Sequence, residues 1–502
     1  MDIRLTADRH RQGELQMKHQ KKGKNRLLYT VILRTVKLLD VLLLTLPFAA
    51  VWYGYYGMRI VAPYRNQGNW VILLLFAALY IINGRIYDAF LVSYQRVSDL
   101  IFSQTLAAFL SDFMLYLVCW VLSRRLPSVW PILLAFSAQI LLAALWASAA
   151  HRLYFALFPT RRTVVVWEVR AGLERLIHQY GLSRKFQVNR VIDAAECMAD
   201  LSVLEDAETV FLADVPSHPR NKIIKYCVEK DISVFMIPRV GDVMMSGAHR
   251  MHMFHLPMLR LDRCDPTPEY LFFKRVFDLL VSGAALLLLS PVMLITAICI
   301  RKSDGGPVFY RQCRMTKDGE EFQVLKFRSM KVDAERDGIE RLSSGDKDDR
   351  VTPVGKVIRK LRIDELPQLF NVLSGKMSIV GPRPERPAIA RQYEKELPEF
   401  RLRLQVKAGL TGYAQVYGKY NTTPYDKLLM DLLYIARPGI LQDMAILFAT
   451  VKVLFSPEST EGIGEGQTTA AAAAEDISDG GTAEKQKQET EREELQKGGE
   501  KE

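Results

Sequence analysis

Two adjacent acids, Asp364 and Glu365, lie in the stretch RIDELPQLFN at residues 362–371 of a strongly basic chain. The three bases just before them are Arg359, Lys360 and Arg362. An ionised carboxylate can act as a nucleophile or bind Mg²⁺, so the acid pair is a candidate for chemistry.

Helix capping is the alternative explanation of the same stretch. Asp364 could be an N-cap, with Glu365 and Pro367 in the first turn and Gly375 closing the far end. Acids favour helix starts, so the stretch alone does not decide between capping and chemistry.

Basic residues line two β-like runs upstream, in GGPVFYRQCRMTKDGEEFQVLKFRSM at residues 305–330. The Lys-Asp-Gly-Glu turn between the runs predicts a β-hairpin. Its cations could bind phosphate or simply form a solvated basic face: Arg311, Arg314, Lys326 and Arg328.

A proline-rich motif, SIVGPRPERP, follows at residues 378–387. Pro382 and Pro384 predict a rigid extended loop that presents Arg383 for bidentate phosphate binding. Two amphipathic stretches come later, at residues 425–439 and 440–455, and could lie on a membrane surface or pack on the sheet.

The elements that must position these residues belong to a long, polarised chain. Its 502 residues carry a formal charge of +11, but residues 457–502 hold 13 acids and 5 bases. The rest of the chain is therefore more basic still, as suits nucleic acid, a membrane surface or phosphorylated substrates. Six scattered cysteines without a C-x-x-C pair argue against disulfides and structural zinc, and favour a reduced, cytoplasm-facing protein.

Four apolar runs, at about 38–53, 70–82, 104–122 and 130–150, approach the length that crosses a bilayer. Tryptophans near their ends are typical of membrane interfaces. Ten Lys and Arg within residues 1–40 predict a cytoplasmic N-terminus, and four spans would return the chain to the cytoplasm.

Residues 160–250 alternate between strand-like and helix-like stretches, which predicts a small parallel sheet with βαβ connections. A dinucleotide fold places G-x-G-x-x-G after the first strand, but here that turn reads WEVRAG, with Gly172 alone. We therefore expect a structural or regulatory module without nucleotide binding.

A further apolar segment, residues 279–300, could span a bilayer. Ser290 and Pro291 lie at its centre, where proline removes a backbone donor and kinks a helix. Basic residues flank both ends, so the sequence leaves open a fifth span or a bent helix that enters and leaves by one face, with Ser290 satisfying a freed carbonyl.

Several motifs in order, KRVFDLL with a following SP, FRSM, RIDELPQLFNVLSGKMSIVGPRPE and GLTGYAQV, resemble the monotopic phosphoglycosyl transferases of bacterial polysaccharide assembly. The whole chain is similar to their long form, the undecaprenyl-phosphate hexose-1-phosphate transferases that initiate exopolysaccharide, capsule and O-antigen synthesis. The resemblance implies that the segment at 276–300 is a re-entrant helix and that the acid pair is catalytic.

The fold class expected from residues and resemblance together is a membrane α-helical bundle, an α/β middle domain and a small α/β catalytic domain with a re-entrant helix. The parts would be a basic cytoplasmic N-terminus (1–26), four transmembrane helices (27–152), a degenerate Rossmann-like, CoA-binding-like module (160–255), the catalytic domain (270–456) and a disordered tail (457–502).

The reaction that the resemblance implies moves a hexose-1-phosphate from a UDP-sugar to undecaprenyl phosphate, and it releases UMP and uses Mg²⁺. Asp364 would form a covalent phosphosugar intermediate, and Glu365 would help to hold the metal. Nearby bases would favour the ionised form of Asp364. Adjacent side chains diverge by about 100° on a regular helix but can converge at a helix start.

Other residues take implied roles toward the substrates. Phosphate contacts would come from Lys326, Arg328, Arg362 and Arg383, with Glu385 beside them. Lys274 and Arg275 would lie at the lipid headgroups, and Asp431 matches an acidic position of the family. The resemblance places Glu385 and Asp431 among the substrate-binding residues.

Location and partners follow from the same resemblance. We expect a multi-pass protein of the bacterial inner membrane with a cytoplasmic catalytic domain, no nucleic-acid partner and a homodimeric assembly. The alternatives are a non-catalytic membrane scaffold or regulator of polysaccharide assembly, and a glycosyltransferase that releases UDP. The sequence does not identify the sugar.

Overall fold

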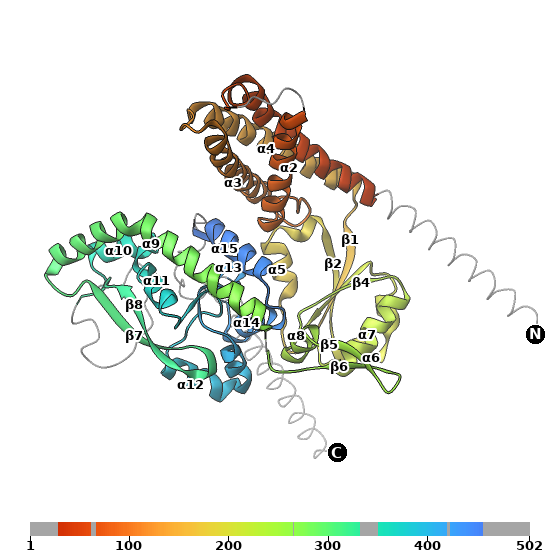
Figure 1. Cartoon of the computed structure of the whole chain (residues 1–502). Helices are drawn as coiled ribbons and strands as arrows, with labels where there is room; N and C mark the ends of the chain where they lie inside the picture. The colour runs from red at the N-terminus through yellow and green to blue at the C-terminus, as the bar shows by residue number, and fades with distance from the viewer. Residues whose placement is uncertain (1–28, 62–66, 265, 332–349, 419–421, 455–502) are drawn as a thin grey trace, which may run out of the picture. The chain divides into compact units, whose positions relative to one another are not determined.

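The computed structural model describes residues 29–61, 67–264, 266–331, 350–418 and 422–454. The predicted basic N-terminus and acidic tail lie outside these residues. The chain forms two compact units, Met1–Thr160 and Arg161–Glu502, whose elements are labelled in Figure 1.

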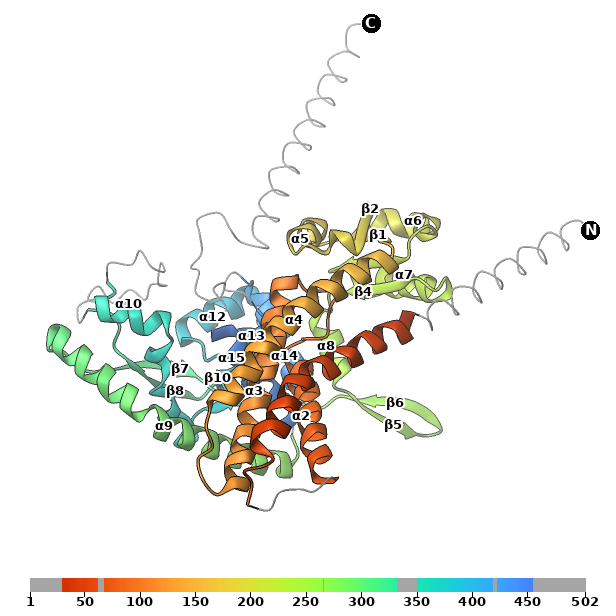
Figure 2. The same cartoon turned by 90° about the horizontal axis from the view of Figure 1, so that it is seen from above.

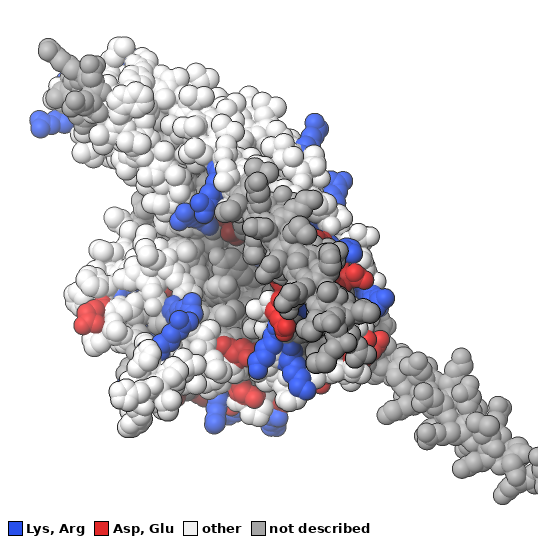
Figure 3. All heavy atoms as spheres, turned by 90° about the vertical axis from the view of Figure 1, so that its right-hand side faces the viewer, with Lys and Arg blue, Asp and Glu red and all other residues white. Residues whose placement is uncertain are grey.

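The described part of the first unit consists of helices joined by turns. A helix over residues 29–51 continues into a π-helical turn, and three further helices follow: α2 (Gln67–Ile86), α3 (Val97–Ser123) and α4 (Trp130–Leu157). Each predicted apolar run lies within one of these four helices. The outer surface of the first unit, seen from one side in Figure 3, is almost free of charged side chains. Among the described residues of both units, the helices long and apolar enough to cross a membrane are α2, α3, α4 and α9 (Pro268–Asp304).

Polar side chains hold the helices of the first unit together from inside. The Tyr80 hydroxyl donates to a fully buried carboxyl group, Asp40, at 3.1 Å, and the Gln104 amide donates to the same group at 3.3 Å. Deeper along the bundle, Asn83 donates to Ser111 at 3.0 Å. Interhelical hydrogen bonds of this kind stabilise helix association in an apolar solvent.

The second unit begins with the middle domain, a parallel sheet as the sequence predicts. Its strands are β1 (Arg161–Trp167), β2 (Phe186–Asp193), β3 (Thr209–Ala213) and β4 (Ser233–Met236), in the order β2-β1-β3-β4. The helices that follow them are α5 (Leu173–Gln179), α6 (Ala194–Ala199), α7 (Ser217–Glu229) and α8 (Val240–Ser246). A separate hairpin, β5 (His249–Met253) with β6 (Leu256–Arg260), extends away from this sheet (Figure 2).

The rest of the second unit carries the acid pair. The predicted hairpin is confirmed as β7 (Phe309–Met315) and β8 (Glu321–Phe327), joined by a turn at Lys317–Gly319. The elements after it are α10 (Pro353–Lys360), η6 (Ile363–Glu365), α11 (Gln368–Leu373), β9 (Ser378–Val380), α12 (Pro387–Glu396), η7 (Pro398–Gln405), β10 (Gly409–Thr411), α13 (Tyr413–Tyr417), α14 (Pro424–Ala436) and α15 (Ile440–Leu454). β9 and β10 pair in parallel.

One hydrophobic core joins these elements. Val324 of β8, Leu369 of α11 and Ile379 of β9 are buried together with Leu428 of α14 and Ile446 of α15. Helices α14 and α15, which lie in the two amphipathic stretches, therefore bury apolar side chains in the domain, as the packing alternative predicts.

Helix α9 is one continuous element of 37 residues, started by a Thr267 cap and ended at Gly305 with a φ of 69°. Pro291 at its centre removes the N–H that would bond the carbonyl four residues earlier, which belongs to Leu287. The Ser290 hydroxyl donates to that carbonyl at 2.9 Å, as predicted. The freed backbone group is thereby satisfied within the helix.

Both halves of α9 pack on the domain that carries the acid pair. In the first half, the Asp278 carboxylate accepts from the Ile379 amide of β9 at 3.0 Å. In the second half, Met293 and Ile300 are buried against Phe327 of β8. The two ends of the helix are thus fixed to one body.

The turn after β1 connects the middle domain to α14. Gly172 precedes α5 with a positive φ of 89°, and Arg170 in the same turn donates to Asp426 of α14 at 2.9 Å. At the other end of α14, the guanidinium of Arg437 donates to the Ser246 carbonyl of α8 at 2.8 Å. The carboxyl edge of the sheet, where doubly wound folds bind ligands, here faces a helix of the neighbouring domain.

We expect this middle domain to bind neither NAD nor coenzyme A. Dinucleotide folds hold the pyrophosphate with backbone N–H groups of a glycine-rich turn, and Arg170 and the single Gly172 replace that turn here. Equilibrium dialysis of the detergent-solubilised chain against either radiolabelled compound, with protein-free micelles as the control, should show no saturable uptake. Saturable uptake would contradict the prediction.

Candidate active site

The acid pair lies on a short turn and not at the first residues of a helix. After α10, Arg362 adopts a left-handed conformation with a φ of 53°, and the next three residues form the 3₁₀ turn η6. Helix α11 begins only at Gln368, with Pro367 as its N-cap and no capping side chain. Capping by Asp364 is therefore wrong, although Gly375 closes α11 with a φ of 82° as predicted.

Glu365 is clasped by two cations from different elements. Its Oε1 accepts from Lys326 Nζ of β8 at 3.2 Å and from Arg383 Nη2 at 2.8 Å. Burial alone would raise the pKa of Glu365, but the charges of Arg383 and Lys326 hold that pKa well below its usual range. This carboxylate is ionised at every physiological pH.

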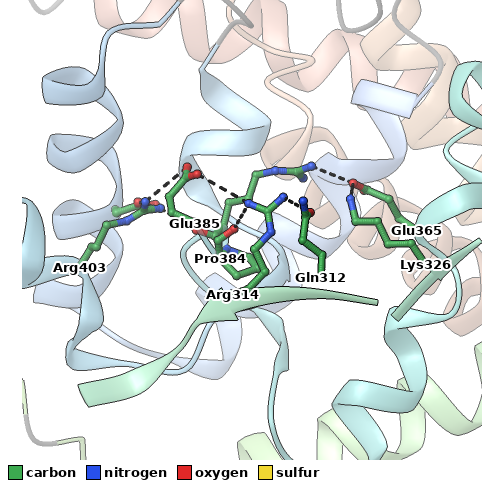
Figure 4. A network of polar contacts seen from close by, with 9 residues as sticks. Gln312, Arg314, Lys326, Glu365, Pro384, Glu385 and Arg403 are labelled. Carbon is green, nitrogen blue, oxygen red and sulfur yellow. Dashed lines mark hydrogen bonds and ion pairs between the residues drawn. The ribbon is translucent and has the colours of Figure 1, made fainter. Parts of the chain in front are cut away.

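The register between α11 and β8 brings Lys326 to the acid pair. The Asn371 side chain accepts from the Leu325 amide at 2.9 Å and donates to the Gln323 carbonyl at 2.8 Å. One amide side chain thus bonds the strand on both sides of Val324, whose side chain is buried in the core. Lys326, two residues after Val324, points to Glu365 (Figure 4).

The pKa of Asp364 shifts in the direction opposite to the pKa of Glu365. Burial raises the pKa of Asp364, the charge of Glu365 raises it further, and Lys326 and Arg359 oppose the rise without cancelling it. The prediction that nearby bases favour the ionised form of Asp364 is confirmed for Arg359, but burial outweighs the bases, so the pKa of Asp364 is raised overall. Two adjacent acids with divergent pKa values are typical of a site in which each has a separate task.

Further ion pairs surround the loop that carries Arg383 (Figure 4). Arg314 of β7 lies 3.9 Å from one carboxylate oxygen of Glu385, and Arg403 of η7 lies 3.6 Å from the other. Burial lowers the pKa of Arg314 to about 10, which leaves the guanidinium charged at neutral pH. Of the predicted residues, Lys326 and Arg383 therefore contact Glu365, whereas Glu385 lies between Arg314 and Arg403.

Asp431 and Arg403 form a buried ion pair of 2.7 Å behind this loop. Asp431 is only 2% exposed, and Arg403 is 5% exposed. Asp431 is one of the residues that the resemblance places among the substrate-binding set, whereas Arg403 was not predicted. The available signal was a polar residue inside the amphipathic stretch of α14, which requires a buried partner from elsewhere in the chain.

Lys274 and Arg275 also lie inside the domain. Lys274 Nζ pairs with Asp443 at 2.9 Å and donates to the Val380 carbonyl at 3.1 Å. The Arg275 guanidinium donates to two carbonyls at the end of α11, those of Val372 and Leu373, each at 2.8 Å. Both side chains therefore tie α9 to the strand and helix that flank the site.

Arg328 directly follows β8, and Arg362 directly precedes η6. Arg328 is buried, with its guanidinium packed on Gly306, and its backbone amide donates to the Val308 carbonyl at 2.9 Å. Arg362 provides the left-handed residue before η6, and its charge helps to lower the pKa of Glu365.

The carboxylates of Asp364 and Glu365, called the dyad below, fit a magnesium ion. Mg²⁺ prefers oxygen ligands and commonly binds through one or two carboxylates together with substrate phosphates. Asp364 and Glu365 supply two carboxylates beside cations that suit phosphate. Nowhere in the described residues do three or more His, Cys, Asp or Glu side chains cluster, so the fit depends on oxygens that a substrate would add.

The model of the family described as bacterial sugar transferase matches residues 269–457. The chain is 38% identical over 238 residues to the UDP-N-acetylgalactosamine-undecaprenyl-phosphate N-acetylgalactosaminephosphotransferase of Aeromonas hydrophila, which covers 47% of this chain and 55% of the relative. It is 42% identical over 247 residues to the UDP-glucose:undecaprenyl-phosphate glucose-1-phosphate transferase of Klebsiella pneumoniae. This match covers 47% of this chain and 53% of the relative.

A shorter relative matches almost throughout. The exopolysaccharide production protein PSS of Rhizobium leguminosarum bv. phaseoli is 38% identical over 192 residues, which is 36% of this chain and 94% of that protein. The chain spans about half the length of the two longer relatives.

Proposed function

The chain belongs to the bacterial sugar transferase family, and on that premise we propose that it transfers a hexose-1-phosphate from a UDP-sugar to undecaprenyl phosphate. The products are UMP and undecaprenyl-diphosphate-sugar, as in the first membrane step of exopolysaccharide or capsule assembly. The observation that carries the proposal is the Glu365 carboxylate held between Lys326 and Arg383, directly beside a second carboxylate of raised pKa.

Asp364 is the nucleophile in this proposal. One of its carboxylate oxygens attacks the phosphorus that bears the sugar, the bond from this phosphorus to the bridging oxygen breaks, and UMP leaves with that oxygen. An oxygen of undecaprenyl phosphate then attacks the same phosphorus and releases the Asp364 carboxylate.

The cations around the dyad bind the phosphates and oppose charge on the departing UMP. Arg383 offers a planar fork for phosphate oxygens, while Lys326 offers a point charge on the other side of Glu365. Glu365, with or without Asp364, would hold Mg²⁺, which neutralises phosphate charge when it is bound.

The nucleotide that is released tests the proposal. Purified chain in nanodiscs with undecaprenyl phosphate and Mg²⁺ should release UMP from at least one member of a panel of UDP-glucose, UDP-galactose and UDP-N-acetylgalactosamine. EDTA should stop the release, and added Mg²⁺ should restore it. Release of UDP would support a glycosyltransferase instead, and release of neither nucleotide would support a non-catalytic scaffold or regulator.

Helix α9 enters and leaves the membrane by the cytoplasmic face in this proposal. The support is that both of its halves pack on the same domain while its outer face is apolar. The exposed fractions on that face range from 62 to 77% for Leu287, Leu288, Leu294 and Ile295. A helix fixed to one body at both ends can bury such a face in a single leaflet without crossing the bilayer.

Cysteine labelling should place both ends of α9 on one side. We expect Phe272→Cys and Ser303→Cys to react with an impermeant maleimide in inverted membrane vesicles and not in right-side-out vesicles. The native cysteines must first be replaced, because Cys299 within the helix is itself exposed. Labelling of the two positions from opposite faces would show a spanning helix.

The proposed site of action is the cytoplasmic face of the bacterial inner membrane, because nucleotide sugars are supplied from the cytoplasm. Homodimerisation stays a prediction, and cross-linking in native membranes would test it.

A further inference from the structure

The loop that carries Arg383, residues 382–385, is held in place by hydrogen bonds from other parts of the chain. Two of its four residues, Pro382 and Pro384, have no N–H group, so hydrogen bonds within the loop are scarce. Its four successive carbonyls instead accept from other parts of the chain. Pro382 O accepts from the Gly409 amide at 2.9 Å, and Glu385 O accepts from the Met315 amide at 3.1 Å.

Arginine side chains provide the two central bonds. Arg403 Nη2 donates to the Arg383 carbonyl at 2.9 Å, and Arg314 Nη1 donates to the Pro384 carbonyl at 3.1 Å. The same two guanidinium groups flank the Glu385 carboxylate. The buried Arg403 and the half-buried Arg314 thus fix the backbone on both sides of the peptide that follows Arg383.

Arg403 and Arg383 do different work although one bonds the other. The Arg383 side chain is 43% exposed and reaches Glu365, whereas the Arg403 side chain is 6% exposed and faces away from solvent. A side chain so buried cannot meet a nucleotide sugar directly. Its effect on substrate must pass through the backbone of Arg383 and the carboxylate of Glu385.

Asp431 fixes Arg403 in turn. Its carboxylate lies 2.7 Å from Arg403 Nη2, the nitrogen that also bonds the Arg383 carbonyl. Burial raises the pKa of Asp431, and the Arg403 charge opposes that rise. Asp431 thus orients the Arg403 guanidinium, which in turn orients the loop that carries Arg383.

We propose that Arg403, oriented by Asp431, is a positioning residue that sets where the Arg383 guanidinium meets the phosphates of the nucleotide sugar. The proposal rests on the proposed transferase function. It assigns Asp431 an indirect role: this acid acts on substrate through two arginines and does not touch it.

A conservative and a disruptive change separate positioning from folding. Arg403→Lys keeps the charge beside Asp431 but loses the planar fork. Arg403→Met leaves the Asp431 charge buried and unpaired, and the double variant Arg403→Met/Asp431→Asn removes that charge again. The matched control is Arg401→Met, because Arg401 lies in the same 3₁₀ segment with an exposed side chain.

The measurements are the KM for UDP-sugar, the KM for undecaprenyl phosphate, kcat and the melting temperature, each in nanodiscs. Displacement of a binding group by about 1 Å can cost about 100-fold, so we expect kcat/KM for UDP-sugar to fall by about that factor in Arg403→Lys and in the double variant. The loss should appear mainly as a raised KM for UDP-sugar, with the KM for undecaprenyl phosphate and the Arg401→Met values within about twofold of wild type.

A purely structural role gives a different pattern. Loss of folded enzyme lowers kcat and leaves both KM values unchanged, and the double variant would then recover activity together with its melting temperature. That result would overturn the inference while the wild type still releases UMP. A wild type that releases no UMP from any UDP-sugar would instead refute the proposed function, and this inference with it.

Discussion

Asp364→Asn should reduce sugar-phosphate transfer by several orders of magnitude and leave the fold intact. The substitution keeps the size of the side chain but removes the attacking carboxylate oxygen. Asp364 caps no helix, so no capping energy is lost. Its pKa is raised by burial and by Glu365, which means that its ionised form destabilises the folded state at neutral pH. We therefore expect the melting temperature at pH 7 to stay constant or to rise.

A covalent adduct is the decisive measurement for this variant. Wild-type chain mixed with labelled UDP-sugar, without lipid acceptor, should retain the sugar phosphate after acid quench, and peptide mapping should locate it on Asp364. Asp364→Asn should retain none, while the control Glu396→Gln, at an exposed acid of α12, should retain as much as wild type. No adduct on the wild type together with normal turnover by Asp364→Asn would refute the nucleophile assignment.

Glu365→Gln should slow transfer by a comparable factor and also change its dependence on pH. The charge of Glu365 raises the pKa of Asp364, so its removal should lower that pKa. In the wild type, kcat/KM for UDP-sugar should fall as the pH drops through the raised pKa of Asp364, where the nucleophile becomes protonated. The acid limb of the variant should lie at lower pH.

The stability of Glu365→Gln should depend on pH in the opposite sense. The folded-state pKa of Glu365 is depressed, so its pairing with Arg383 and Lys326 stabilises the fold above its unfolded pKa of about 4.3. This contribution disappears as the pH falls from there through the folded pKa. The melting temperature of the variant should lie below that of wild type at pH 7, and the gap should narrow in acid. If the acid limb of kcat/KM for UDP-sugar lay at the same pH in Glu365→Gln and in the wild type, Asp364 would not be the titrating nucleophile.

Local patterns in the sequence predicted several of the elements. Alternation and turn residues predicted the parallel sheet and the β7–β8 hairpin, and both are confirmed. The serine-proline pair predicted the bond from Ser290 to the freed carbonyl. These inferences succeed because each depends on residues within a few positions of one another.

Contacts between distant residues could not be found in the same way. Arg403 looks like one of several exposed bases in PEFRLRLQ, and only the fold brings it to Asp431 and to the Arg383 carbonyl. Asp443, in an apolar run, likewise needs Lys274 from a helix far upstream. The net pKa of Asp364 depends on burial, which a list of neighbouring charges does not contain.

Helix α14 serves two domains with a single backbone. Asp426 and the chain after its end contact the middle domain, while Asp431, between them, faces Arg403. A substitution on the edge of the middle domain therefore also affects the residues of α14 that contact it. A chimera that receives a foreign middle domain without its matching α14 would lose the Arg170–Asp426 pair and strain the helix that orients Arg403. A crossover placed before residue 161, which exchanges both partners together, avoids that mismatch.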